Sequence, residues 1–219
     1  MPISRKVKAD FFKTWNPKMA YVLGFFCADG SLSTNKNGGR YFSIQIKDLK
    51  LLRDIKKLLQ SDHKIAKRIH NQYKCIFYRL QIGSKEIWQD LHNLGIREQK
   101  TKRLKLPVIP DDFFFDFVRG YFDGDGGVWV GKIHKSRPVQ SLTLQVYFTS
   151  GSPDFLRSLR KELLKYDIKG CLYDRPKGAE VLRYSAKSSI LLCREMYKRE
   201  AIHLSRKKKK FEEFLKLRS

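Results

Sequence analysis

Acidic side chains are scarce in this sequence. Asp and Glu total 22 among 219 residues against 46 Lys and Arg, which gives a formal net charge of +24 at pH 7. A like-signed excess of this size repels itself in a folded chain unless a polyanion compensates it. A surface that served only solubility would mix the two signs more evenly. The composition therefore favours a nucleic acid as partner over an anionic membrane.

Cysteine is also scarce, and long apolar runs are absent. The four cysteines lie far apart and form no C-x-x-C pair, which argues against a zinc site or a disulfide framework and fits a reducing compartment. No apolar run reaches membrane length, and the N-terminal segment MPISRKVKADFF has no apolar signal core. We therefore expect a soluble, intracellular protein without a signal peptide or a membrane partner.

Apolar residues make up 42% of the chain, enough for one sizeable core or two closely packed halves. Their periodicity predicts the same order of elements twice: helix, hairpin, helix, hairpin, helix. In the second half the last two of these helices are expected to open at Ser152-Pro153 and after Ser188, and a further charged helix follows. We expect a duplicated α+β unit in one pseudo-symmetric globular body, with an N-terminal repeat at 1–106 and a C-terminal repeat at 107–219.

The outward positions of the expected strands carry amides, basic groups and a tyrosine, whereas carboxylates are scarce there. An antiparallel sheet that packs helices on one face keeps its polar face open. A merely solvated face would favour Glu, Lys and Thr about equally, while the side chains present are those that hydrogen-bond base edges and phosphates. The residues expected to contact DNA are Gln45, Lys47, Arg79, Gln81, Gln145, Tyr147 and Arg183.

Two apolar segments end in the same way, AYVLGFFCADGS at residues 20–31 and DFVRGYFDGDGG at residues 116–127. Each segment predicts a helix that ends in Asp-Gly, the first at Asp29 and the second at Asp125. Both helices carry small residues four positions apart, a spacing that lets two backbones approach closely. The small residues are Ala20, Gly24 and Ala28 in the first segment and Gly120 and Gly124 in the second.

If the helices pack through these small residues, Asp29 and Asp125 meet at the negative ends of two helix dipoles. Two carboxylates so placed need a cation, or one of them takes up a proton. Mg²⁺ accepts oxygen ligands from carboxylates and phosphates together. Paired acids, a hard metal and a polyanionic partner predict phosphodiester hydrolysis.

The segments VLGFFCADG and VRGYFDGDG lie about a hundred residues apart and resemble the two motifs of the double-motif LAGLIDADG homing endonucleases. The resemblance extends over essentially the whole chain. It implies two αββαββα units, with the motif helices at their interface and two antiparallel sheets that form a DNA-binding saddle. It also implies a monomer that cuts both strands of a long, asymmetric double-stranded target across the minor groove. The hydrolysis would be Mg-dependent and would leave short 3′ overhangs.

On matching positions, the resemblance assigns metal binding to Asp29 and Asp125, with two or three divalent ions. Mg²⁺ would serve catalysis, and Mn²⁺ or Ca²⁺ could substitute for binding. Cys27 and Asp123 fill an earlier acidic position of the motif, which is not a metal ligand. The catalytic basic residues near the ends of the two halves correspond to Lys100 in GIREQKTKR and, within a residue or two, to Lys207 in LSRKKKKF.

The family also has a polar residue after the first hairpin that holds a metal-bound water. Ser150 stands there in the second half, but Ile46 does so in the first, where Gln45 or Lys47 would have to substitute. We therefore expect two unequal strand-cutting sites. Because no splicing blocks flank the repeat, an intron-encoded, free-standing enzyme is expected. Two alternatives on the same fold are a maturase, with its intron RNA as an added partner, and a non-catalytic DNA-binding regulator.

Overall fold

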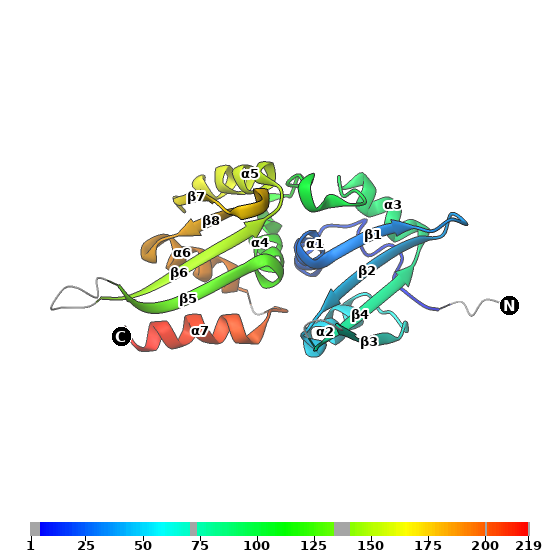
Figure 1. The fold of residues 1–219 in the computed structure, drawn as a ribbon, viewed down its shortest axis with the longest axis horizontal. Helices are drawn as coiled ribbons and strands as arrows, with labels where there is room; N and C mark the ends of the chain where they lie inside the picture. Colours follow the sequence, from blue (N-terminus) through cyan, green and yellow to red (C-terminus); the bar gives the residue numbers. More distant parts are fainter. Residues whose placement is uncertain (1–4, 71–73, 134–140, 200, 219) are drawn as a thin grey trace.

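The computed structural model describes residues 5–70, 74–133, 141–199 and 201–218. Two four-stranded antiparallel sheets lie on either side of two adjacent helices, α1 and α4 (Figure 1). The first half contains α1 (Pro17–Asp29), β1 (Gly30–Thr34), β2 (Arg40–Ile46), α2 (Leu49–Leu58), β3 (Ile65–His70), β4 (Cys75–Gly83), α3 (Lys85–Asn93) and the 3-10 helix η1 (Lys100–Lys102). The second half contains α4 (Asp111–Asp125), β5 (Gly126–Ile133), β6 (Ser141–Ser150), α5 (Pro153–Leu164), β7 (Gly170–Asp174), the 3-10 helix η2 (Pro176–Gly178), β8 (Glu180–Tyr184), α6 (Ala186–Tyr197) and α7 (Ser205–Lys216).

The strand orders show the duplication directly. The first sheet runs β1-β2-β4-β3 and the second β5-β6-β8-β7, so that each half joins its two hairpins in the same way. Registers also correspond, because Gly30 pairs with Ile44 and Gly126 pairs with Phe148 directly after the two motif helices. The expected pseudo-twofold α+β fold is therefore confirmed.

Polar side chains cap the three α-helices α1, α2 and α3 of the first half. The Asn16 side chain accepts from the backbone N–H of Met19 at 3.0 Å, and Pro17 occupies the first turn. Asp48 accepts in the same way from the backbone N–H of Leu51 at 2.8 Å, and Ser84 does so for α3. These polar caps explain why the helices of the first half begin where the sequence predicts.

The helix expected to open at Ser152-Pro153 does begin there, although the Ser152 hydroxyl donates to the carbonyl of Leu104 and does not cap α5. Two other expectations in detail were wrong. The helix expected after Ser188 begins at Ala186, so Ser188 lies inside α6, where its Oγ accepts from the backbone N–H of Lys169. Strand alternation predicts that Ile76 faces the core together with Leu80 and Ile82, but Ile76 is exposed near the hairpin end of the β3–β4 ladder.

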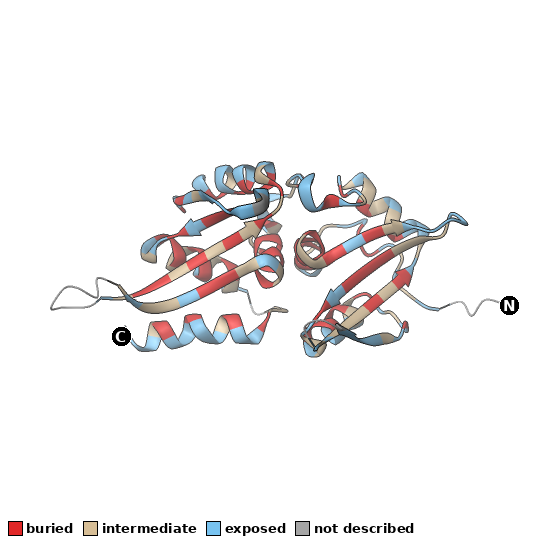
Figure 2. Ribbon diagram, in the orientation of Figure 1, coloured by how far each residue is buried: buried red, intermediate tan, exposed pale blue. Residues whose placement is uncertain are grey.

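The core lies between the helices and the inner faces of the sheets. Figure 2 shows buried residues gathered on α1 and α4 and at alternate positions along the strands. The small-residue contact between α1 and α4 is also present. A Cβ atom added to Gly120 would lie 2.0 Å from the Tyr21 carbonyl oxygen, and one added to Gly124 would lie 2.3 Å from the Ala28 Cβ. Among the described residues, no helix is both long and apolar enough to cross a membrane.

Candidate functional site

The ends of α1 and α4 bring two carboxylates together. Each helix ends at its aspartate, and the following glycine enters the first strand of its sheet with an extended backbone. A Cβ atom on Gly124 would lie 3.0 Å from Asp29 Oδ2, so the Asp29 carboxylate reaches across to the last turn of α4. The small-residue contact therefore determines that Asp29 and Asp125 share one site at the centre of the molecule.

Electrostatics in this site disfavours two charged acids. Loss of hydration and, next, the neighbouring Asp125 carboxylate raise the pKa of Asp29 from 3.8 to about 6, against the opposing effect of two lysines. Asp125 is more exposed than Asp29, and desolvation raises the pKa of Asp125 as well. The site therefore favours a bound cation or a proton.

Each motif helix has one buried lysine at its C-terminal end. Lys100 Nζ donates to the carbonyls of Cys27 at 2.7 Å and Ala28 at 3.2 Å, at the end of α1. Lys207 Nζ donates to the carbonyls of Asp123 at 2.9 Å and Gly126 at 2.6 Å, at the end of α4, and also to that of Phe122. A cation at this end opposes the negative pole of the helix dipole. The two lysines thus occupy corresponding places beside the two acids.

Both lysines are buried, at 8% exposure for Lys100 and 5% for Lys207. Burial lowers the pKa of Lys100, and it lowers the pKa of Lys207 to about 8. The run of four lysines at 207–210 left the second position uncertain by a residue or two. Lys207 hydrogen-bonds the end of α4, whereas Lys208 and Lys209 extend toward Glu212 and Glu213 on α7 and Lys210 is exposed.

The donor set fits a hard divalent cation held largely by the substrate. Mg²⁺ is commonly bound by one or two carboxylates, with waters and phosphate oxygens completing its coordination. Asp29 and Asp125 supply the two carboxylates. Within the residues that the structure describes there is no cluster of three or more His, Cys, Asp and Glu side chains able to hold a metal. A phosphate-rich partner would therefore have to complete the site.

The open face of the first sheet carries the residues expected there. Gln45 pairs with Arg79 across β2 and β4, and Gln81 pairs with Ser43 on the same face. Lys47 follows β2 and places its ammonium 5.3 Å from the centre of the Phe77 ring. These side chains form one polar and basic surface.

The open face of the second sheet is more aromatic. Tyr147 pairs with Arg183, and the guanidinium of Arg183 lies 5.1 Å from the centre of the Tyr173 ring. Gln145 pairs with Trp129, which is 43% exposed. Sequence reasoning missed Trp129, although its place between Val128 and Val130 gives the alternation of a strand residue that points outward.

The sequence also predicts a DNA contact for Ser150, but this residue does not lie on the open face of the second sheet. Ser150 ends β6 on the same face as Phe148, which packs against the helices, and not on the face of Tyr147. Its buried Oγ accepts a hydrogen bond from the backbone N–H of Ser152 at 3.0 Å. The register does place Ser150 and Ile46 at corresponding positions of the two halves, as the sequence comparison of the halves predicted.

The duplicated fold, with paired acids at the ends of two touching helices, defines the double-motif LAGLIDADG class. The family model described as a LAGLIDADG-like domain matches residues 16–102 and 112–216, and the chain belongs to this family. Similar solved structures include the meganuclease I-SmaMI bound to uncleaveable DNA, with TM-score 0.63 and 17% identity over 92% of this chain and 90% of that one. Another is I-AabMI bound to uncleaved DNA, with TM-score 0.61 and 18% identity over 93% and 90%.

A curated relative from Methanocaldococcus jannaschii matches this chain over only a small part of its own length. It is a replication factor C small subunit, 30% identical over 116 residues. The matched part covers 52% of this chain but only 6% of the length of that protein. The similarity is thus confined to a small segment of a much longer chain.

Proposed function

We propose that the protein is a site-specific endonuclease that cuts both strands of double-stranded DNA by Mg-dependent hydrolysis and leaves 3′ overhangs. The observation that carries the proposal is the meeting of Asp29 and Asp125 at two helix ends, each with a buried lysine beside it. Family membership and the DNA complexes of I-SmaMI and I-AabMI support a DNA substrate. Because one chain supplies both acids, the protein acts as a monomer.

The two open sheet faces bind the DNA. Arg79, Lys47 and Arg183 neutralise phosphates, while the amides of Gln45, Gln81 and Gln145 and the hydroxyl of Tyr147 read base edges. The polar first sheet and the more aromatic second sheet would read different half-sites, which suits a long and asymmetric target. The net charge of +24 supports strong attraction to the phosphate backbone.

At the centre, the carboxylates of Asp29 and Asp125 would hold two or three divalent cations through their oxygen atoms. When bound there, such cations polarise the phosphate and stabilise the attacking and leaving oxygens. Ca²⁺ or Mn²⁺ could occupy the same oxygen sites, and I-SmaMI has been solved with its uncleaved target in the presence of calcium ions. Lys100 and Lys207 add positive charge beside the reacting phosphate, where charge develops in the transition state.

The test begins with selection of a target from a randomised DNA library by Mg-dependent cleavage with the wild-type protein. Asp29→Asn and Asp125→Asn should each abolish cleavage of this target while binding survives. Asp154→Asn is the matched control, because Asp154 lies exposed on α5 and forms a surface ion pair with Arg157. Cleavage retained in either site variant would contradict the proposal.

We also infer an intron-encoded reading frame. The DNA that flanks the frame tests this inference, because a homing enzyme is usually inserted at the site that it recognises. Exon sequences that together reconstitute the selected target would support it. A frame continuous with a longer host protein, the setting of the similar segment in the replication factor C small subunit, would contradict it.

A further inference from the structure

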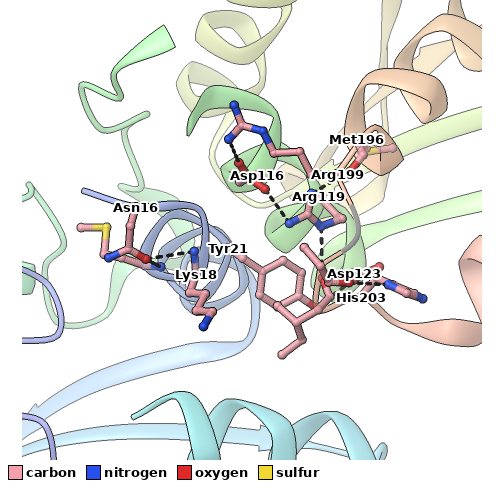
Figure 3. A network of polar contacts seen from close by, with 12 residues as sticks. Asn16, Lys18, Tyr21, Asp116, Arg119, Asp123, Met196, Arg199 and His203 are labelled. Atoms are coloured by element: carbon pink, nitrogen blue, oxygen red, sulfur yellow. Dashed lines mark hydrogen bonds and ion pairs between the residues drawn. The ribbon is translucent and has the colours of Figure 1, made fainter. Parts of the chain in front are cut away.

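A buried carboxylate joins both motif helices to the beginning of α7 (Figure 3). Asp123, two residues before the end of α4, is 3% exposed. Its Oδ2 accepts from the Tyr21 hydroxyl of α1 at 2.8 Å and from the backbone N–H of Leu204 at 2.7 Å. Since Leu204 directly precedes α7, this single oxygen ties the start of α7 to the interface between the two halves.

One turn earlier on α4, Arg119 holds the segment that connects α6 to α7. Its guanidinium donates to the carbonyls of Met196 at 2.7 Å and Ile202 at 3.1 Å. A third hydrogen bond, to Asp116 at 2.7 Å, balances its charge. Arg119 is 2% exposed, and a buried guanidinium must satisfy its donors. Arg119 therefore attaches the first part of the α6–α7 connection to α4, and Asp123 attaches the last part, just before α7.

These attachments determine where Lys207 lies. Lys207 falls in the first turn of α7, three residues after Leu204. Its ammonium has three donors, and all three are directed to carbonyls at the end of α4. The lysine is therefore held in one place, and that place depends on where α7 begins.

Among the described residues of the first half, α1 has no corresponding charged network. The close approach of the two helices makes Gly24 and Gly120 corresponding residues. Counted from them, Asp116, Arg119 and Asp123 on α4 correspond to Ala20, Leu23 and Cys27 on α1, which are buried and bear no charge. Lys100 lies instead in η1, which follows Gln99 in a left-handed conformation with φ 52°. The two lysines reach corresponding places by different means.

Buried charged groups are costly to desolvate and are weak evidence for added stability. A role in setting position explains them better here, because Asp123 and Arg119 direct their hydrogen bonds at backbone groups between Met196 and Leu204 and at two side chains of the motif helices. We propose that Asp123, assisted by Tyr21 and Arg119, is a positioning residue for Lys207. Cutting of one DNA strand depends on this network, and cutting of the other does not. This inference rests on the proposed function.

The test uses a supercoiled plasmid that carries the selected target, and follows each strand separately. Asp123→Cys introduces the residue of the first half, and Tyr21→Phe removes only a hydroxyl. Asp123→Cys should slow one strand by about a hundredfold, the loss that a misplacement of about 1 Å can cause. Nicked circles should then accumulate. Tyr21→Phe should slow the same strand by a smaller factor, and Asp154→Asn should cut as the wild type does.

Three further variants make the test specific for position. Lys207→Met should slow the same strand as Asp123→Cys, and the double variant should be no slower than Lys207→Met alone. Lys100→Met should slow the opposite strand. Asp123→Asn keeps an oxygen for the Leu204 N–H and should recover much of the lost rate. Equal slowing of both strands by Asp123→Cys, or a bias opposite to that of Lys207→Met, would overturn the proposal.

Hydrogen exchange of the free protein separates this inference from the proposed nuclease activity. In Asp123→Cys the amides of residues 204–211 should lose protection while those of β2 and β4 keep it. Unchanged protection at 204–211 would contradict the positioning role whether or not the protein cuts DNA. Loss of protection together with a wild-type protein that cuts no DNA would overturn only the proposed nuclease function.

Discussion

Gly24 of α1 faces the carbonyl oxygen of Phe117 on α4 so closely that a Cβ atom on Gly24 would lie 2.0 Å from this oxygen. Gly120 has the reciprocal relationship with Tyr21. The two backbones therefore touch, and the contact aligns the two helix ends that carry Asp29 and Asp125. The close packing at these glycines therefore determines where the two catalytic acids are expected to lie relative to each other.

Gly24→Ala should destabilise the protein, because the added methyl group meets backbone that cannot move aside without separating the helices. Overpacking of this kind costs about 1–3 kcal/mol. Urea unfolding monitored by circular dichroism measures the change in the free energy of unfolding. Gly83→Ala is the matched control, since its Cβ would lie 3.5 Å from the Tyr41 ring in ordinary contact. Equal stability of the two variants would contradict the close contact between helices.

The stability of the metal-free protein should depend on Asp29 between about pH 4 and 6. Its pKa is raised from 3.8 to about 6 in the folded state, so the folded state retains a proton that the unfolded state has lost. The contribution of Asp29 is therefore absent below the unfolded pKa and becomes increasingly destabilising as pH rises toward 6. Its full size at neutral pH is about 1–3 kcal/mol.

The comparison of wild type with Asp29→Asn isolates this contribution, because other carboxylates titrate in both proteins. Unfolding in the presence of a chelator, measured from pH 3.5 to 7.5, should show that the variant gains relative stability as pH rises. A variant that is less stable than the wild type at pH 7 would show that the carboxylate is not destabilised by its surroundings.

Breaking the buried pair of Arg119 and Asp116 should be costly. Arg119→Leu leaves the Asp116 carboxylate buried with one partially exposed arginine as its partner. Removal of one member of a buried ion pair costs about 3–5 kcal/mol. The double variant Arg119→Leu/Asp116→Ala carries the residues of the first half and should recover at least half of this loss.

Thermal and urea unfolding of the single and double variants form the test. Lys169→Leu is the control, because it removes an exposed ion pair with Asp167 and should leave stability nearly unchanged. A double variant as unstable as Arg119→Leu alone would show that the backbone hydrogen bonds of Arg119, rather than its charge, dominate.

DNA binding should weaken steeply as salt increases. The logarithm of the binding constant should fall with the logarithm of salt concentration, with a slope of about 0.9 for each phosphate contacted. Arg79→Ala should weaken binding and reduce this slope by about 1. Lys187→Ala, on the exposed surface of α6, should leave the slope unchanged. A flat salt response of the wild type, measured by fluorescence anisotropy with duplex DNA, would count against the proposed binding faces.

Much of the fold was predictable because its signals are local. Asn16, Asp48 and Ser84 cap helices through side chains that bond the next turn. Strand alternation identified the open faces, and it also places Ser150 on the inward face, because the inward series of β6 continues to the end of the strand. The corresponding positions of Ser150 and Ile46 were also predictable, since each follows its motif at the same register.

The sequence by itself determined the duplicated order of elements, the small-residue contact of α1 and α4, and the two acids that end them. Only the tertiary structure decided which of four consecutive lysines reaches the site, and that Asp123 holds the start of α7. Tyr21 and Leu204 lie more than eighty positions from Asp123 in sequence, so no local pattern joins them. Hydration of buried charges depends on which distant segments exclude water, and for that reason the pKa of Asp29 and the place of Lys207 emerge only on folding.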